Sequence, residues 1–399
     1  MSRPLLDLAA RFGTPLYVYD LATVRARARA LLAAVTWRPF QPLFAIKANP
    51  VPAVAQAIVA EGFGVDAVSP GEVALALRLG VDSAKVLYTE NNMTDAEQTA
   101  ALAQNVLVNC GSLDRLQRLA QAGATRAAVR FNPDIGAGAH EKICTAGPLT
   151  KFGVHYSLVD QVRAVERGSA LKVVGCHMHI GSGFLDADAF VRACGVLLSV
   201  ARQLPNLEFI DFGGGLGIPY KPDDGPIDLA RVGAEVSRLM AEFCAAYGRP
   251  LELRLEPGRF LVAESGTLLT TVTSVKTNPG PDGRTFAGCD SGFNHLVRPT
   301  MYGAYHRIAN LSRPDAAPQK VDVVGNICES GDIFARDRML PAPQPGDVLA
   351  IGDAGAYGSA MASTYNTRPL PAEVVLDGDL VRLARRRQTV DELLSAWEW

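Results

Sequence analysis

The stretch PLFAIKAN, residues 42–49, begins as an apolar run and ends in a lysine followed by Ala-Asn. Apolar runs of the same kind recur at residues 127–129 and 207–210. Between such runs lie stretches such as 113–120, whose apolar residues are three and four positions apart, as in an amphipathic helix. Repeated strand–helix units over about residues 22–255 predict a parallel sheet with crossover helices. At this length we expect the closed form, an eight-stranded (β/α)8 barrel, with a doubly wound open sheet as the alternative.

The sequence pattern changes after residue 266. A Val/Thr-rich run at 268–273 and a Gly/Pro-rich turn at 341–346 predict a second, mostly β domain. Residues 389–397 predict one short helix, with Thr389 as N-cap and Glu392 as its capping-box partner. We therefore predict an α/β chain with two domains, a TIM-type barrel over residues 22–266 and a β-rich domain made of residues 1–21 and 267–399.

The bulk composition excludes several classes of protein. The formal net charge is −2 over 399 residues, so no basic surface for nucleic acid is predicted. We expect no membrane association, because no apolar run approaches the roughly 20 residues that a membrane helix needs. The N-terminal residues lack a signal-peptide pattern. The seven cysteines are scattered and never in CxxC spacing, which is typical of a reducing cytoplasm.

Lys47 is the first candidate for chemistry. It stands where the apolar run 42–46 ends, and burying an ammonium group is costly unless the group is used. A desolvated lysine is a nucleophile for carbonyls, including the aldehyde of pyridoxal phosphate (PLP). The alternative is a lysine that simply emerges into solvent.

His177 and His179 are two positions apart on a predicted strand and therefore share a face. They suit a metal site, although no third ligand has a recognisable spacing, or an imidazole stacked on an aromatic cofactor. The Gly-Ser-Gly at 181–183 would let an anion approach. The alternative is one structural and one exposed histidine.

Three further groups point to a cofactor with a phosphate. The glycines at 213–215 follow a strand and offer backbone N–H groups, although they form neither GxGxxG nor a P-loop; a tight barrel turn is the alternative. Glu256 at a strand end can hydrogen-bond a pyridinium nitrogen. Arg259 can serve a phosphate or a substrate carboxylate, or form a surface salt bridge.

Two groups in the β-rich region are also candidates. Cys328 lies beside two carboxylates, which suits a proton donor better than a thiolate nucleophile. The cluster at 352–357, followed by 365–369, brings two tyrosines and an arginine among small residues, as in a binding loop. A glycine-rich β turn is the alternative.

Taken together, these motifs resemble one family over nearly the whole chain, the PLP-dependent decarboxylases built from a barrel and a β domain. The motifs occur in the order FAIKAN at 44–49, HMHIGS at 177–182, GGG at 213–215, EPGR at 256–259, CESGD at 328–332 and GAY at 355–357. Within this group the chain is most similar to the diaminopimelate decarboxylases. Further stretches match that branch: RFNP at 130–133 with His140 and KFG at 151–153, Arg298-Pro299 with Tyr302, and YN at 365–366 with RP at 368–369.

The resemblance implies a role for each matching residue. It implies PLP as cofactor, carried by Lys47, and Cys328 as proton donor. The other implied cofactor contacts are His179, Ser182, Gly213, Gly214, Gly215, Glu256 and Tyr357. The implied substrate contacts are Arg259, Arg298, Tyr302, Glu329 and Tyr357. No metal is implied. The implied assembly is a homodimer in which Cys328 and Glu329 reach the active site of the other subunit.

The resemblance also implies the reaction, from meso-2,6-diaminopimelate to L-lysine and carbon dioxide. Two departures leave room for a related substrate. Gly183 stands where most members carry Gln, and Cys-Thr-Ala-Gly at 144–147 replaces the usual Ser-Thr-Gly. The open alternatives are decarboxylation of ornithine, lysine or a carrier-linked or siderophore precursor, and a non-catalytic PLP-binding regulator. The retention of Lys47 and Cys328 argues against the regulator.

Overall fold

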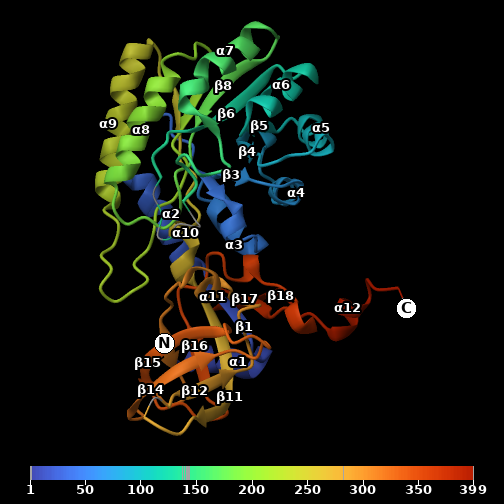
Figure 1. The fold of residues 1–399 in the computed structure, drawn as a ribbon, viewed down its shortest axis with the longest axis vertical. Helices are drawn as coiled ribbons and strands as arrows, with labels where there is room; N and C mark the ends of the chain where they lie inside the picture. Colours follow the sequence, from blue (N-terminus) through green and yellow to red (C-terminus); the bar gives the residue numbers. More distant parts are fainter. Residues whose placement is uncertain (1, 137, 139, 141–143, 282, 399) are drawn as a thin grey trace. The chain divides into compact units, whose positions relative to one another are not determined.

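A computed structural model describes residues 2–136, 138, 140, 144–281 and 283–398 of the chain (Figure 1). The chain divides into two compact units. The barrel unit comprises Arg25–Pro219 and Gly225–Leu261, and the β unit comprises Met1–Val24, Tyr220–Asp224 and Val262–Trp399.

The barrel unit is built on parallel strands in the order β10-β9-β8-β6-β5-β4-β3-β2, with the short β7 paired to β6. The strands are β2 (Leu43–Ala45), β3 (Gly64–Ala67), β4 (Val86–Thr89), β5 (Leu107–Cys110), β6 (Arg126–Asn132), β7 (Val154–His155), β8 (Lys172–His177), β9 (Phe209–Asp211) and β10 (Glu252–Arg254). The two end strands meet, because the backbone N–H groups of Gln41 and Leu43 donate to the carbonyls of Leu253 and Leu255, at 2.9 and 2.8 Å. The predicted barrel is therefore confirmed.

Helices alternate with these strands and cover the outside of the sheet (Figure 1). They are α2 (Leu21–Ala34), α3 (Pro52–Val59), α4 (Pro70–Arg78), α5 (Asp95–Ala103), α6 (Leu113–Gln121), α7 (Val159–Arg167), α8 (Asp188–Ala201), α9 (Leu229–Tyr247) and α10 (Arg259–Val262). Several begin where the sequence supplies a side-chain cap. Ser69, Thr94 and Ser112 each accept a hydrogen bond from the backbone N–H three residues on, which satisfies a donor that the first helical turn leaves free.

The β unit contains a sheet in the order β15-β14-β12-β11-β1-β17-β18, with β16 paired to both β11 and β13. Its strands are β1 (Leu16–Asp20), β11 (Gly266–Thr277), β12 (Thr285–Cys289), β13 (Ile308–Asn310), β14 (Pro318–Val324), β15 (Ile333–Pro341), β16 (Val348–Ile351), β17 (Ala372–Asp377) and β18 (Leu380–Arg385). Its helices are α1 (Ser2–Phe12), α11 (Arg298–Tyr302) and α12 (Val390–Leu394). The capping box predicted at Thr389 and Glu392 is present at the start of α12.

The first strand of the chain lies in the middle of this sheet. β1 runs antiparallel to β11 and parallel to β17, so Leu16 pairs with both Leu269 and Ala372. Figure 1 shows it in blue among orange and red strands. Leu8 of α1 and Leu16 belong to one apolar cluster with Leu269 and Val374, and this cluster ties the N-terminal residues into the core of the β unit.

Candidate active site

Lys47 lies just past the C-terminal end of β2, in the turn Ile46–Ala48. Its Nζ forms an ion pair with the carboxylate of Asp66 on the neighbouring strand β3. The Asp66 side chain is 1% exposed and the Lys47 side chain 32% exposed, so the carboxylate is buried while part of the lysine side chain is accessible. Burial and the charge of Glu256 raise the pKa of Asp66. The charge and hydrogen bond of Lys47 act in the opposite direction and lower it, but not enough to cancel the rise.

Glu256 follows β10 and is paired with His177 at the end of β8. The Nε2 of His177 lies 3.0 Å from Oε2 of Glu256, and both side chains are buried. Burial alone would raise the pKa of Glu256, but the charge and hydrogen bond of His177 outweigh it and lower the pKa. The other oxygen, Oε1, is buried and has no hydrogen-bond partner in the described part of the chain. An ionised carboxylate with one unused oxygen suits the protonated nitrogen of a pyridine ring.

Asp211 at the end of β9 lies beside this pair. Donor atoms of His177, Asp211 and Glu256 lie within 4.8 Å of one another, a separation that a metal ion could also span. One oxygen of Asp211 accepts the backbone N–H of Gly213 at 2.8 Å. Burial raises the pKa of Asp211 well above its usual range. The absence of a metal stays a prediction.

His179 is held by the glycine loop. Its Nδ1 accepts a hydrogen bond from the backbone N–H of Gly214 at 3.1 Å, so Nδ1 carries no proton. Desolvation, followed by the charges of Arg130 and Lys47, lowers its pKa well below the usual range. The imidazole is therefore neutral, and a neutral flat ring is suited to stacking on an aromatic cofactor.

The glycine loop has no room for side chains. Gly213 and Gly215 have φ of 70° and 112°, in the left-handed region that favours glycine. A Cβ on Gly214 would lie 2.0 Å from the backbone oxygen of Glu256. Beside the loop, Ser182 Oγ accepts hydrogen bonds from Arg259 Nη2 and Nε, at 3.1 and 3.3 Å. A hydroxyl can donate to a phosphate, and a guanidinium can serve a phosphate or a carboxylate. The backbone N–H groups of Gly213 and Gly214 already donate to Asp211 and His179, so these glycines offer a phosphate room rather than donors.

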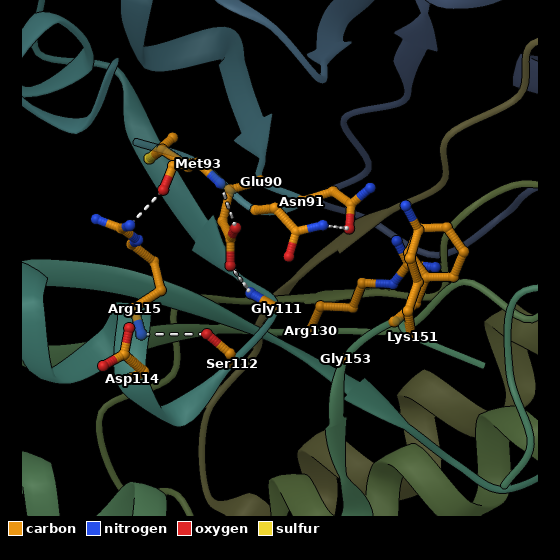
Figure 2. A pocket seen from close by; sticks show the side chains of 12 residues that line it. Glu90, Asn91, Met93, Gly111, Ser112, Asp114, Arg115, Arg130, Lys151 and Gly153 are labelled. Carbon is orange, nitrogen blue, oxygen red and sulfur yellow. Dashed lines mark hydrogen bonds between the residues drawn. The ribbon is translucent and has the colours of Figure 1, made fainter. Parts of the chain in front are cut away.

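A polar cavity of about 260 Å³ lies where β4 and β5 end (Figure 2). On one side of it, Glu90 accepts the backbone N–H of Gly111 at 2.6 Å. On the other side lies Arg130 of β6, whose Nη2 donates to the backbone oxygen of His179 at 3.2 Å and whose guanidinium covers the ring of Phe152. Burial lowers the pKa of Arg130 to about 10, so it stays charged at neutral pH and places a cation next to His179.

The remaining candidates lie in the β unit. Arg298 at the start of α11 is buried; its Nη1 lies 3.0 Å from Nε2 of His306, and its guanidinium covers the ring of Tyr220. Tyr302 closes the same helix. Tyr357 is a non-glycine residue with φ of 55°, a strained conformation that often marks a functional position.

Cys328 and Glu329 are exposed in the single chain and form side-chain hydrogen bonds to Asn366 and Tyr365.

The structure thus groups the predicted site residues by unit. The barrel unit brings together Lys47, His179, Ser182, Gly213, Gly214, Gly215, Glu256 and Arg259. The β unit holds Arg298, Tyr302, Cys328, Glu329 and Tyr357. Sequence reasoning missed Asp66 as the partner of Lys47 and His177 as the partner of Glu256. The sequence marked His177 together with His179 as a metal or cofactor candidate but gave no sign of its pairing with Glu256. For Asp66 the only signal was a carboxylate in an apolar strand.

The chain is similar to known proteins over nearly its whole length. The pyridoxal-binding domain of the pyridoxal-dependent decarboxylases matches residues 21–263. The chain is 44% identical to diaminopimelate decarboxylase of Methanothermobacter thermautotrophicus, covering 98% of this chain and 92% of that protein. It is 36% identical to the Escherichia coli K12 enzyme of the same name, covering 98% of this chain and 95% of that protein.

Solved structures give the same result. A crystal structure of diaminopimelate decarboxylase superposes with a TM-score of 0.93 at 36% identity, covering 99% of this chain and 96% of that one. The Helicobacter pylori diaminopimelate decarboxylase complexed with L-lysine gives 0.91 at 32% identity, covering 98% of both chains. Among the described residues, no helix is both long and apolar enough to cross a membrane.

Proposed function

Because this chain belongs to the diaminopimelate decarboxylases, within the pyridoxal-dependent decarboxylase family, we propose that it converts meso-2,6-diaminopimelate to L-lysine and carbon dioxide. The observation that carries the proposal is the buried Glu256–His177 pair close to Lys47, with one carboxylate oxygen left over. This arrangement serves a nitrogen heterocycle with an aldehyde, and PLP is such a group.

The residues of the barrel unit fit PLP group by group. Lys47 would bind its aldehyde carbon, and His179 would lie against the ring. Glu256 would meet the pyridine nitrogen with Oε1. Ser182 would hold the phosphate, and the glycines at 213–215 would leave room for it. Bound PLP supplies an electron sink for the bond between Cα and the departing carboxylate.

The protein's own groups control charge and protons around that sink. Glu256 is ionised, because His177 lowers its pKa, and it therefore keeps a proton on the ring nitrogen. Asp66, whose carboxylate is buried, holds Nζ of Lys47 through the ion pair. The thiol of Cys328 gives its proton to Cα after the carboxylate has left.

The distal end of the substrate explains the choice of diaminopimelate. Arg259, Arg298 and Tyr302 bind its distal carboxylate, and Glu329 binds its distal amine. Lysine and ornithine have no distal carboxylate, so they lose the charge-assisted hydrogen bonds that these guanidiniums would give it. A site built to hydrogen-bond a substrate group discriminates against analogues that lack the group by on the order of a thousandfold or more.

A substrate panel read by carbon dioxide release tests the assignment. We expect diaminopimelate to exceed lysine and ornithine by about a thousandfold in kcat/KM. Arg298→Ala should reduce this difference in kcat/KM, because it lowers the value for diaminopimelate and leaves the value for lysine almost unchanged. Equal turnover of all three substrates by the wild type would reduce the assignment to a general amino-acid decarboxylase.

The assembly that this function requires is a homodimer with shared sites. Cys328 and Glu329 are exposed in the single chain, and a proton donor in water would be of no use to a desolvated reaction. Mixing Lys47→Ala with Cys328→Ala subunits should restore part of the activity, because one site of each heterodimer is then intact. No recovery, with subunit exchange shown separately, would contradict the shared site. A cytoplasmic location stays a prediction from the sequence.

A further inference from the structure

The loop that carries Cys328 and Glu329 is fixed at its base. The buried carboxylate of Asp332 accepts the backbone N–H groups of Ile327 and Phe293, at 2.7 and 2.6 Å. Asp332 is 3% exposed, so these charge-assisted bonds are shielded from water. Asp332 therefore holds the base of the loop. The segment at 365–367 contacts the backbone N–H of Cys328 and the side chains of Cys328 and Glu329.

Asn366 contacts Cys328 twice through one amide. Its Oδ1 accepts the backbone N–H of Cys328 at 3.1 Å, and its Nδ2 donates to Sγ of Cys328 at 3.2 Å. The two contacts fix the orientation of the amide, because a flipped amide would set donor against donor at the backbone. Asn366 has φ of 58°, a left-handed conformation that asparagine tolerates better than most residues.

Tyr365 does for Glu329 what Asn366 does for Cys328. Its hydroxyl donates to Oε1 of Glu329 at 2.9 Å, and its ring stacks on Phe293 with centroids 5.9 Å apart. The hydrogen bond and charge of Glu329, with smaller contributions from Cys328, raise the pKa of Tyr365, so the hydroxyl keeps its proton and remains a donor. One oxygen of the glutamate is thus oriented, and the other remains for a ligand.

We propose that Tyr365 and Asn366 are positioning residues with different main tasks, Asn366 setting the sulfur of Cys328 for proton transfer and Tyr365 setting the carboxylate of Glu329 for the distal ammonium. The inference rests on the proposed function. When the S–H bond breaks and the proton passes to Cα, the electron pair stays on sulfur. The Nδ2–H of Asn366 then donates to a thiolate instead of a thiol, and hydrogen bonds to charged groups are the stronger ones. Water returns the proton to sulfur before the next turnover.

The two tasks predict different kinetic effects. Asn366→Asp keeps a residue that tolerates the left-handed backbone and keeps an oxygen that accepts the Cys328 N–H. It replaces the Nδ2–H group that donates to Sγ of Cys328 with a carboxylate oxygen. We expect kcat to fall about tenfold or more with KM within twofold, since a bond to a charged group is lost. Asn366→Gly keeps the left-handed backbone, removes the amide and should also lower kcat. Tyr365→Phe should raise KM about three- to tenfold with kcat within twofold.

Asn105 supplies the matched control. It is exposed, has φ of 55° and follows the end of α5 in the barrel unit. Asn105→Asp and Asn105→Gly impose the same chemical changes away from Cys328 and should leave kcat and KM unchanged. Comparing Tm across all variants shows whether each protein is folded.

A measurement without substrate separates this inference from the proposed function. Iodoacetamide alkylation of Cys328 in the holoenzyme, followed by mass spectrometry of its peptide, should slow about threefold or more in Asn366→Asp, because sulfur then faces a carboxylate. Tyr365→Phe removes only a weaker interaction with Cys328 and should alkylate within about twofold of the wild-type rate. The inference is overturned if Asn366→Asp alkylates and turns over like the wild type, or if both variants change kcat and KM alike. Full activity of Cys328→Ala would instead refute its role as proton donor, whatever the alkylation rates are.

Discussion

Replacing Gly214 with alanine tests how closely the glycine loop must approach its neighbours. The added Cβ would lie 2.0 Å from the backbone oxygen and 2.9 Å from the carbonyl carbon of Glu256, where ordinary contact begins at 3.4 Å. Both obstacles are backbone atoms, so no side chain can rotate away. Gly214 does not have a positive φ, and the effect of the substitution is therefore steric rather than conformational.

The expected magnitude follows from that overlap. The loop must move away from Glu256 by roughly 1 Å, about twice the tolerance of a working site. The same shift breaks the hydrogen bond from the Gly214 N–H to Nδ1 of His179. Overpacking of this kind costs about 1–3 kcal/mol of stability. If the displaced loop weakens cofactor binding by the same amount, PLP affinity falls about five- to 150-fold.

The assay is an absorbance titration of the apoprotein with PLP, together with the free energy of unfolding. Gly195→Ala is the control, because Gly195 lies within α8 and has nothing within 4 Å of its built Cβ. It should keep wild-type affinity and gain about 0.5–1 kcal/mol of stability, as alanine favours helix over glycine. Wild-type PLP affinity and turnover in Gly214→Ala would refute the steric reasoning.

Three further predictions concern the groups around the cofactor. The protein with PLP should absorb visible light, and borohydride should fix the cofactor on Lys47 in the wild type but not in Lys47→Ala, as peptide mass spectrometry would show. Glu256→Gln should lower kcat about a hundredfold because the ring nitrogen loses its anionic partner, whereas Glu252→Gln on the half-buried side of β10 should leave kcat unchanged. His179 has a lowered pKa in the folded chain, so the unfolded chain binds the extra proton as pH falls below about 6.5 and stability drops by at most about 1.4 kcal/mol per pH unit. The Tm should therefore fall more steeply between pH 6.5 and 5 in the wild type than in His179→Gln, and parallel curves would contradict the neutral imidazole.

Local features of the fold could be predicted from the sequence, because their cause is local. The amphipathic stretch at 113–120 became α6 (Leu113–Gln121), and the capping box at Thr389 lies where the spacing placed it. Lys47 and Glu256 were recognised because each stands at the end of an apolar run. Their partners were not. Asp66 meets Lys47 only through the pairing of β2 with β3, which no spacing along the chain encodes.

The contacts at Cys328 could not be predicted for the same reason, because they join segments that are far apart in the sequence. The sequence marked Cys328 and Glu329, and it marked residues 365–369 separately as a binding loop. The loop at 365–369 forms one hydrogen bond to the side chain of Cys328 and one to that of Glu329. Both bonds depend on a turn in which Asn366 has a positive φ. Side-chain orientation of this kind depends on the tertiary structure, and a single sequence carries no measure of it.

The central place of β1 has a consequence for biosynthesis. A ribosome releases residues 16–20 early, but their partners in the two neighbouring strands are Gly266–Leu269 and Ala372–Leu376. The nascent strand therefore leaves the exit tunnel with both edges unpaired and with apolar side chains that are buried in the folded protein. It stays unpaired while several hundred more residues are added. Such a segment is a natural binding site for a chaperone and a starting point for aggregation when translation stalls. A premature stop before residue 372 would deprive β1 of one neighbour for good, so truncated products should be degraded quickly rather than accumulate as folded fragments.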